Sequence, residues 1–455
     1  MALTFAAPSQ LIVQTPQASA VPVSGLHRSV GAAVKTTSAA APAGAQWASA
    51  AIAVGAAAAG LVGGRTSRRR GGLRPQPLRR ADGMARAANP LEMAFGLGGD
   101  GKKTVIITGA SSGLGLAATK ELALGGEWHV IMACRDFQKA EKVATAANLP
   151  KDSYTVLHCD LSANNSVRQF VTAFRALGRP LDALVCNAAV YFPNAHKPGA
   201  FFPGLFPGGG PRWSADGHEL SFAANYLGHF LLCNLLLDDL KSSKVKPARC
   251  IILGTVTASI NNKELGGMIP PLADVGQFQG LEQGMVGPEV SMVDGGKFNG
   301  AKAYKDSKVC DVMLMRELHR RYHKSTGIVF SSLYPGCIAD TGLFREHYPV
   351  FQTLFPVLQK SVTNAYVSEE EAGRRLAQCV TDPKYTTSGS YYTWGGESGT
   401  GGAGGSDATD NTDITIDRFA NFGSFRTLSV DEIGGDAGDN ARCEKLWELS
   451  EKLIQ

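Results

Sequence analysis

Seven short apolar segments that alternate with helical segments constrain the fold of this chain more than any other feature. They are rich in Val, Ile and Leu and occupy residues 103–109, 129–135, 154–161, 181–189, 250–255, 328–336 and 390–394. Helical spacing of apolar residues predicts helices over 114–126, 137–147, 164–177, 218–241, 302–323 and 368–381. Strands that alternate with helices form a parallel sheet covered on both faces. We therefore predict an α/β fold: a Rossmann-type, doubly wound, mostly parallel seven-stranded sheet, with ligands at the carboxyl ends of its strands.

The first ninety residues differ in composition from the rest of the chain. They are rich in Ala, Ser, Pro and Arg and contain a single acidic residue, Asp82. Such a composition is typical of an organelle transit peptide. The uncharged stretch 47–64 is just long enough to span a membrane, but it consists mostly of Ala and Gly. We interpret it as part of the leader and keep a retained membrane anchor as the alternative.

We predict that residues 1–98 are a targeting leader, removed or without a fixed structure, and that residues 99–455 form one catalytic domain. Two segments interrupt the strand–helix rhythm of this domain. Residues 258–300 are a long connection punctuated by Gly and Pro, and residues 395–423 are an insertion rich in Gly and Asp. We expect the second insertion to be a surface loop.

The distribution of charge and the spacing of cysteines argue against nucleic-acid binding and against a metal site. Residues 1–90 hold ten of the 45 Lys and Arg, which leaves 35 basic and 39 acidic residues in the rest of the chain. We therefore expect no nucleic acid as a partner of the main domain. The nine cysteines form no C-x-x-C pair, so we expect reduced thiols, mostly in the core, and no metal site.

A glycine turn, "TGASSGLG", follows the first strand and opens the first helix. Glycines let the backbone approach a pyrophosphate, which the free amides at a helix N-terminus bind. The context of strand, turn and helix predicts a nucleotide site. Its residues are Gly109, Ser111, Ser112, Gly113, Leu114 and Gly115.

The end of the second strand selects the nucleotide. Arg135 lies 20 residues after Gly115, close to where an NAD-binding fold places an acidic residue on the ribose. Lys139 follows one helical turn later, and two cations suit the 2′-phosphate of NADP. Asp136 is adjacent, so the preference for NADPH over NADH is not absolute.

The ends of the third and fourth strands complete the predicted cofactor site. Asp160 and Leu161 end the third strand, and Asn187, Ala188 and Ala189 end the fourth. We expect contacts with adenine and with the nicotinamide ribose at these positions. Asn187 is polar at the end of an apolar strand and therefore needs a partner.

Tyr304 and Lys308 are four residues apart in "KAYKDSK", so they share one face of a predicted helix. A phenol ordinarily titrates near pH 10, too high for efficient acid–base work. A neighbouring ammonium favours the phenolate and lowers that pKa. Lys308 can also bind the nicotinamide ribose.

The glycine turn, "CNAA" and Y-x-x-x-K together resemble the short-chain dehydrogenase/reductase superfamily. The resemblance implies that Tyr304 exchanges a proton while NAD(P)(H) exchanges a hydride. It also implies that Asn225, in "AANYLGHFLL", anchors a proton-relay water. Thr257 (or Thr255) occupies the place of the family's active-site serine, but it lies 47 residues before Tyr304. This longer separation puts simple alcohol–ketone chemistry in doubt.

A narrower resemblance covers nearly all of residues 102–394 and the last dozen residues. The motifs "LDALVCNAAVYFP", "NYLGHFLLCNLLLDDLK", "FNGAKAYKDSKVC" and "SLYPGCIADTGLFREHYPVF" are similar to those of light-dependent protochlorophyllide oxidoreductases. The chain departs from that pattern at 395–423 and in an enlarged segment, 201–213.

That resemblance implies light-driven reduction of the C17–C18 double bond of protochlorophyllide by NADPH, in chlorophyll biosynthesis. Hydride would reach one carbon, and a proton, expected from Tyr304, the other. Tyr191, Cys337 and Thr257 would line the pigment pocket, and Cys337 is an alternative proton source. The resemblance also implies a plastid protein that associates peripherally with thylakoid or inner-membrane lipid and forms a homo-oligomer.

Two other functions compete with this hypothesis. One is an NADPH-dependent carbonyl or retinoid reductase that works without light, and the other is a non-catalytic pigment- or NADP(H)-binding scaffold. The displaced Thr257 argues against the first, and the set Tyr304, Lys308 and Asn225 argues against the second. For residues 342–360, we favour a lid over the pigment, while membrane or subunit contact is a compatible alternative.

Overall fold

The computed structural model describes residues 101–193, 210–255, 272–285, 287, 290–336, 338–339, 341–347, 349–361, 367–394, 425–428 and 438–455. Several predicted features lie wholly or partly outside these residues: the leader 1–98 with its stretch 47–64, residues 201–209 of the enlarged segment, residues 258–271 of the long connection, the insertion 395–423, Thr257 and Cys337. The whole described part belongs to one compact unit of the chain.

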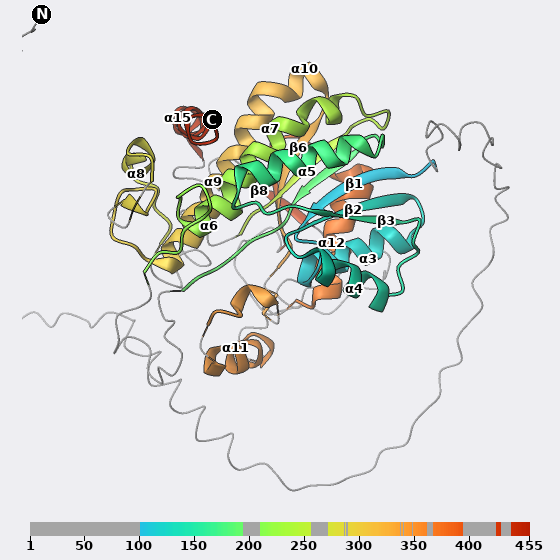
Figure 1. The fold of residues 1–455 in the computed structure, drawn as a ribbon, viewed down its shortest axis with the longest axis horizontal. Helices are drawn as coiled ribbons and strands as arrows, with labels where there is room; N and C mark the ends of the chain where they lie inside the picture. The colour runs from blue at the N-terminus through green and yellow to red at the C-terminus, as the bar shows by residue number, and fades with distance from the viewer. Residues whose placement is uncertain are drawn as a thin grey trace, which may run out of the picture. The chain divides into compact units, whose positions relative to one another are not determined.

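A twisted sheet forms the centre of the described residues (Figure 1). Its strands are β1 (Lys103–Thr108), β2 (Trp128–Cys134), β3 (Tyr154–His158), β4 (Ala183–Cys186), β5 (Arg249–Leu253), β6 (Val329–Tyr334), β7 (Ser390–Trp394) and β8 (Phe425–Leu428). Their order across the sheet is β3-β2-β1-β4-β5-β6-β7-β8. The order reverses between β1 and β4, which is the point where doubly wound sheets bind ligands.

The seven predicted strands are confirmed and are mutually parallel. The strand count was nevertheless too low, because β8 pairs with β7 in the antiparallel direction and adds an eighth strand at the edge. This strand has four residues, Phe425–Leu428. A segment so short has no recognisable alternation of its own, and its pairing with β7 identifies it.

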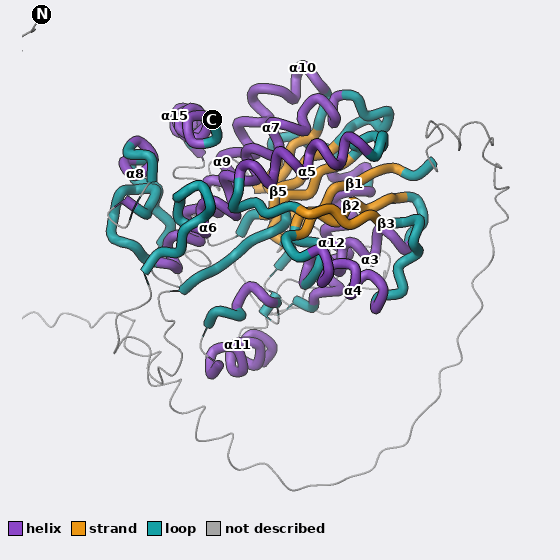
Figure 2. The backbone as a smooth tube through the Cα atoms, in the orientation of Figure 1, coloured by secondary structure: helices purple, strands orange, loops and turns teal. Residues whose placement is uncertain are grey.

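Helices cover both faces of the sheet (Figure 2). The long helices are α3 (Gly113–Leu124), α4 (Phe137–Ala146), α5 (Asn164–Ala176), α7 (Gly228–Lys241), α9 (Gly300–Leu318), α11 (Pro349–Ser361), α12 (Glu369–Thr381) and α15 (Asn440–Leu453). The shorter elements are α6 (Leu220–Phe222), η2 (Ala223–Leu227), α8 (Gln279–Glu282), η5 (His319–His323), α10 (Lys324–Thr326), η6 (Gly342–Phe344) and η7 (Pro383–Tyr385).

Alternation along the strands produces two apolar cores. Ile106 of β1 points to the face covered by α5, α7, α9 and α15. Its neighbours Val105 and Ile107 point to the opposite face, under α3, α4 and α12. Successive side chains of a strand face opposite sides, and a parallel sheet buried on both faces needs apolar residues at every position. The near-continuous apolar runs of the sequence have this cause.

Two of the predicted helices contain π-helical turns. The helix predicted over 218–241 consists of α6, the π-helical turn η2 and α7, and η2 contains Asn225. A second π-helical turn, η5, follows α9. Such turns re-aim side chains and occur often at functional sites.

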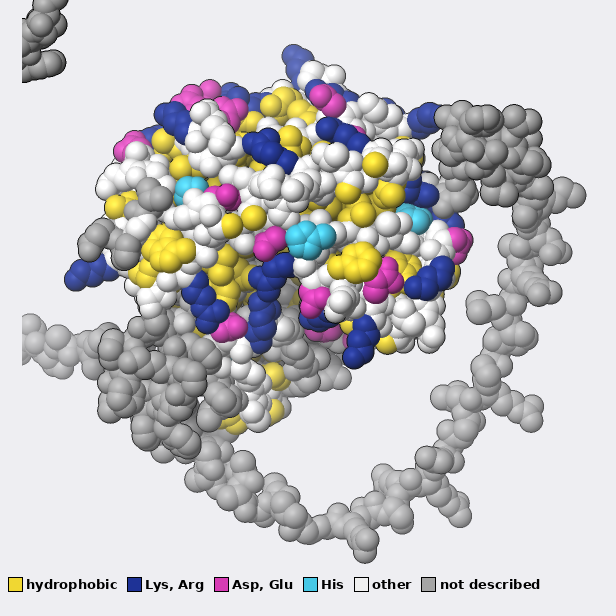
Figure 3. All heavy atoms as spheres, viewed as in Figure 1, with side chains coloured by type: hydrophobic (Ala, Val, Ile, Leu, Met, Phe, Trp, Pro, Cys, Tyr) yellow, Lys and Arg dark blue, Asp and Glu magenta, His cyan; other side chains and the backbone are white. Residues whose placement is uncertain are grey.

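None of the helices in the described ranges is both long enough and apolar enough to cross a membrane. Figure 3 shows Lys and Arg interspersed with acidic and apolar side chains on the face in view. That face carries no continuous basic stripe of the kind that binds a nucleic-acid backbone.

Candidate active site

The glycine turn has the backbone geometry that the sequence predicted. Gly109 and Gly113 have φ of +69° and +55°, values that favour glycine. A Cβ on Gly115 would lie 2.5 Å from the carbonyl oxygen of Gly109. Ser112 is the N-cap of α3 but makes no capping hydrogen bond with its side chain. The turn therefore presents the helix N-terminus to a phosphate.

The same glycines have a second, internal purpose. A Cβ on Gly109 would lie 2.9 Å from the Cα of Ala188, and one on Gly115 would lie 2.6 Å from Nδ2 of Asn187. The ends of β1 and β4 therefore pack together only because both positions lack side chains. Leu114, between them in the sequence, is half-buried.

Arg135 and Lys139 are both exposed near the carboxyl end of β2. Asp136 is engaged elsewhere, because its Oδ1 accepts a hydrogen bond from the backbone N–H of Lys139 at 2.9 Å and caps α4. The acidic residue that could have bound a ribose hydroxyl thus serves as a helix cap. Arg135 and Lys139 are then the charged side chains available for a ligand at this end of the site.

Asp160 and Leu161 have different surroundings after β3. Oδ1 of Asp160 accepts hydrogen bonds from the backbone N–H and the hydroxyl of Ser162, at 3.0 and 2.7 Å. Leu161 is buried against Gly228, where a Cβ would overlap the carbonyl of Leu161. These contacts make a stiff turn, and a contact with adenine stays a prediction.

The hydroxyl of Thr108, at the end of β1, connects β1 to β4. It accepts hydrogen bonds from the backbone N–H groups of Asn187 and Ala188 at 2.8 and 3.0 Å. The side-chain amide of Asn187 donates to the backbone oxygen of Thr108 at 2.8 Å. Asn187 therefore has the partner that its polarity required, and Ala189 follows it, half-buried.

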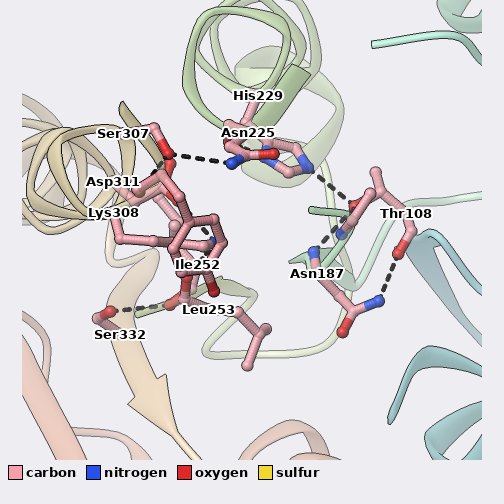
Figure 4. A network of polar contacts seen from close by, with 12 residues as sticks. Thr108, Asn187, Asn225, His229, Ile252, Leu253, Ser307, Lys308, Asp311 and Ser332 are labelled. Atoms are coloured by element: carbon pink, nitrogen blue, oxygen red, sulfur yellow. Dashed lines mark hydrogen bonds and ion pairs between the residues drawn. The ribbon is translucent and has the colours of Figure 1, made fainter. Parts of the chain in front are cut away.

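A fully buried histidine continues this network (Figure 4). Nδ1 of His229 lies 2.6 Å from the backbone oxygen of Asn225, and Nε2 lies 2.9 Å from the hydroxyl of Thr108. A carbonyl only accepts, so Nδ1 carries the proton and Thr108 donates to Nε2. Burial lowers the pKa of His229 to about 3, so the ring is neutral.

Asn225 joins β4 to the tyrosine helix. Its Oδ1 accepts from the backbone N–H of Val190 at 2.7 Å. Its Nδ2 donates to the carbonyl of Val190 and to the hydroxyl of Ser307, both at 3.0 Å. Ser307 in turn donates to the backbone oxygen of Tyr304 at 2.7 Å. The contacts of Asn225 are thus with protein groups, and an anchored relay water stays a prediction.

Tyr304 and Lys308 lie one turn apart on α9, as expected from their spacing. Tyr304 is half-buried, whereas Lys308 is buried. Nζ of Lys308 donates to the carbonyl of Leu253 and to Oδ2 of Asp311, both at 2.9 Å. The ammonium is thereby held at the carboxyl end of β5.

An aromatic group flanks the phenol of Tyr304. The ring of Tyr191 lies 5.1 Å from that of Tyr304 and 5.2 Å from that of His347. Phe344, in η6, meets Tyr191 edge-on at 6.2 Å. Burial raises the pKa of Tyr191 to about 12, so this phenol stays neutral. Rings of this kind suit a flat, apolar ligand beside Tyr304.

Three cysteines meet in the core near this site, although their spacing in the sequence did not suggest it. The sulfur of Cys233 lies 3.6 Å from that of Cys186 and 3.8 Å from that of Cys250. In the described part of the chain, they are the group of side chains that could hold a soft metal. All three are at most 2% exposed. Burial raises the pKa of Cys186, whereas hydrogen bonds with Cys186 and Cys233 lower the pKa of Cys250 to about 5. A metal site needs an entry path, and burial separates these sulfurs from solvent, so we assign the three to core packing.

The structure brings together most of the residues that the sequence singled out. The glycine turn, Asn187, Asn225, Tyr304, Lys308 and Tyr191 form one site at the carboxyl edge of the sheet, whereas Thr257 and Cys337 lie outside the described residues. The supporting residues Thr108, His229, Ser307 and Asp311 were not predicted. Ser307 stands inside "AYKDSK" and Thr108 opens the glycine turn, so proximity to a motif was the available signal for both.

Comparison with known proteins adds two findings. A family model described as short chain dehydrogenase matches residues 103–263. A protein named "Protochlorophyllide reductase, chloroplastic" from Cucumis sativus is 51% identical over 360 residues, which cover 78% of this chain and 80% of that protein. A protein of the same name from Chlamydomonas reinhardtii is 51% identical over 353 residues, 78% of each chain. "Protochlorophyllide reductase A, chloroplastic" from Arabidopsis thaliana is 51% identical over 354 residues, 78% of this chain and 77% of that one.

Proposed function

Because this chain belongs to the protochlorophyllide reductases, within the short-chain dehydrogenases, we propose that it reduces protochlorophyllide to chlorophyllide in a light-driven, NADPH-dependent reaction. The enzyme is an oxidoreductase of chlorophyll biosynthesis and acts in the plastid. The pigment itself absorbs the photon, and the C17–C18 double bond is reduced.

The residues of the site fit NADPH. The glycine turn leaves space that a Cβ would fill, and α3 begins at that turn. Arg135 and Lys139 suit a 2′-phosphate, and Asp136 is occupied as the cap of α4. We assign Asn187 and Lys308 to contacts with the nicotinamide ribose. A bound nicotinamide cofactor supplies the hydride.

The residues of the chain supply the proton and exclude water. We assign the proton donor to Tyr304, whose O–H bond breaks as a C–H bond forms at one carbon of the double bond. The other carbon receives the hydride with its electron pair, and solvent reprotonates the phenolate. The phenol of Tyr304 is shielded by the rings of Tyr191, Phe344 and His347. Lys308 is itself held in place by its hydrogen bond to the carbonyl of Leu253.

One observation carries this proposal: an unbroken chain of hydrogen bonds joins the glycine turn to Tyr304. It runs from Thr108 through His229 and Asn225 to Ser307, and from there to the backbone of Tyr304. A network of fully satisfied buried groups fixes positions rigidly. The proton donor is therefore held in register with the cofactor turn.

A flash experiment tests the reaction. Purified full chain is mixed with NADPH and protochlorophyllide in the dark, and its absorbance is recorded before and after a flash. We expect the red shift to chlorophyllide after the flash. Product formed in darkness, or reduction of ketones without light, would instead favour the carbonyl reductase, and binding without reduction would favour the scaffold.

The Tyr304→Phe variant tests the proton donor. We expect it to bind pigment and cofactor but to form product about 10²–10⁴-fold more slowly, the usual contribution of a general acid. Tyr322→Phe, in η5 beyond the site, is the matched control and should react at the wild-type rate. An unchanged rate in Tyr304→Phe would assign the proton to another group, with Cys337 the next variant to examine.

We also propose peripheral attachment to thylakoid or inner-membrane lipid and self-association, both through α11. Leu354 and Val357 of this helix are 54% and 55% exposed, and apolar side chains displayed on one helix suit such contacts. Flotation with phosphatidylglycerol vesicles measures lipid binding, and sedimentation measures self-association. Both are carried out on Leu354→Asp and on the control variant Leu177→Asp. Equal behaviour of the two variants would assign α11 to the lid alone.

The leader and the single domain complete the proposal. We assign residues 1–98 to plastid targeting and residues 99–455 to the catalytic domain, on the composition of the first ninety residues. Mass determination of the protein recovered from isolated plastids after import locates the cleavage site. A mature chain that retains residues 47–64 would support an anchor instead.

A further inference from the structure

Helix α9 buries a carboxylate directly beside the Tyr304–Lys308 pair. Oδ2 of Asp311 lies 2.9 Å from Nζ of Lys308, and the two side chains are 1% and 3% exposed. The second oxygen, Oδ1, has no hydrogen-bond partner in the described part of the chain. A buried ion pair with an unsatisfied oxygen contributes little to stability. The pair therefore calls for an explanation in the chemistry of the site.

Lys308 is the charged group that Asp311 faces. From β4, the thiol of Cys186 lies near this carboxylate, and from η2, the phenol of Tyr226 does so as well. Burial raises the pKa of both groups, so both are neutral. Burial also raises the pKa of Asp311 to about 6, against the opposing effect of Lys308. At neutral pH Asp311 is thus a carboxylate, and its charge opposes that of the ammonium with which it pairs.

The net charge beside a tyrosine determines whether it acts as an acid or a base. An uncompensated ammonium favours the phenolate, which suits a dehydrogenase that removes a proton from an alcohol. A reductase that delivers a proton to carbon needs the phenol instead. A carboxylate that pairs with the ammonium weakens the electrostatic effect of the ammonium on the phenol, while the ammonium stays in the site.

We propose that Asp311 is a positioning residue that cancels the charge of Lys308 and so keeps Tyr304 protonated for its role as donor. This inference rests on the proposed function, in which Tyr304 gives a proton. Asp311 also orients Lys308, since it takes one of the three donor positions of the ammonium and leaves another for the carbonyl of Leu253.

Asp311→Asn tests the inference directly, because the amide has the same shape and still accepts from Lys308. The phenolate of Tyr304 is followed by ultraviolet absorbance from about pH 7 to 11, as the difference between each protein and its Tyr304→Phe counterpart. We expect Tyr304 to titrate about one to two pH units lower in Asp311→Asn than in the wild type, since a full positive charge then stands beside it. The pH above which the yield of product per flash declines should fall by the same amount.

Asp306→Asn is the matched control on the same helix. Asp306 is also buried, and it pairs with Lys302 at 2.6 Å and accepts from the backbone N–H of Asp274. Asp306 faces Asp274 in the connection that precedes α9, and it pairs with Lys302 and not with Lys308. We therefore expect no shift in the titration of Tyr304 when this carboxylate is removed. Equal shifts in the two variants would mean a general effect of charge on α9 and would overturn the inference.

The outcomes separate the inference from the proposed function. If Tyr304 titrates alike in the wild type and in Asp311→Asn, while Tyr304→Phe is inactive, the inference fails and the function stands. If Tyr304→Phe forms product at the wild-type rate, the inference fails together with the assignment of Tyr304 as proton donor, while light-driven reduction of the pigment stands; if the wild type forms no product after a flash, the proposed function itself fails. Should Asp311→Asn not fold, Asp311→Ser serves in the same titration, because its smaller side chain is neutral.

Discussion

At the scale of single residues, the sequence after the second strand leaves open which of two side chains contacts the cofactor ribose. Arg135 and Asp136 are adjacent, and each could have bound a ribose substituent. The structure removes Asp136 from that choice, because its carboxylate caps α4. We therefore expect the exposed guanidinium of Arg135 to contact the 2′-phosphate of NADPH.

Arg135→Ala should weaken the binding of NADPH far more than that of NADH. One lost charge-assisted, bidentate contact corresponds to a roughly 10- to 100-fold rise in the dissociation constant for NADPH. Titration of both cofactors by fluorescence measures the two constants. Equal losses for the two cofactors would refute a phosphate contact, and Lys151→Ala, outside the site, should change neither.

At the scale of elements, the packing of α12 on α3 positions the glycine turn. Gly373 of α12 lies so close to α3 that an added Cβ would be 2.5 Å from the Cβ of Ala117 and 2.7 Å from its carbonyl carbon. The first residue of α12, Glu369, and Thr341 both lie beside Gly113. The close contact of α12 with α3 therefore supports the glycine turn.

Gly373→Ala should separate these two helices. We expect a loss of about 1–3 kcal/mol in the free energy of unfolding, the usual cost of overpacking, together with weaker cofactor binding. Denaturant titration with and without NADPH measures both. Gly210→Ala is the control, since a Cβ there meets nothing within 4 Å, and equal stability of the two variants would show that α12 yields without strain.

The tyrosine helix shows how far local pattern extends. Its spacing predicted a helix over 302–323, and the structure contains α9, η5 and α10 over the same stretch. The pattern did not reveal the two π-helical turns, because a single turn with i→i+5 hydrogen bonds interrupts the 3.6-residue period over too few residues to be recognised in the sequence. The turn η2, which contains Asn225, was therefore found by its backbone hydrogen bonds.

At the scale of the whole molecule, a buried neutral histidine links stability to pH. Burial lowers the pKa of His229 to about 3 from a usual value of 6.5. The unfolded chain therefore binds a proton between about pH 6.5 and pH 3 that the folded chain does not bind. The stability due to neutral His229 is fully present above pH 6.5 and is lost as the pH falls through this window.

The wild type should therefore lose stability on acidification more steeply than His229→Gln. The difference in slope should reach about 1.4 kcal/mol per pH unit, which corresponds to one proton. Unfolding free energies measured between about pH 7 and 4 check this value. The raised pKa values of Asp306 and Asp311 act in the opposite direction but are common to both proteins. Parallel curves would contradict the buried, neutral state, and His158→Gln, at an exposed position, should leave the slope unchanged.

The sequence by itself determined the seven parallel strands and their alternation with helices, and it singled out the residues that we propose for cofactor and pigment binding. Strand periodicity, the glycine turn and Y-x-x-x-K are local patterns, because each depends on the geometry of one element or one turn. For the same reason Tyr304, Lys308, Asn187 and Arg135 could be named from their motifs and from their places in the predicted strands and helices. The edge strand β8 could not, since four residues become a strand only through a partner.

The tertiary structure alone decided what surrounds those residues. Thr108 and His229 are 121 positions apart, and Asn225 and Ser307 are 82 positions apart, yet each pair shares a hydrogen bond. No spacing rule connects such positions, because their contact follows from the stacking of helices on the sheet. The same stacking removes water from Lys308 and Asp311. The sequence could therefore indicate a tyrosine beside a lysine, while the fold buried the neighbouring carboxylate of Asp311 that, on our inference, makes this tyrosine a donor.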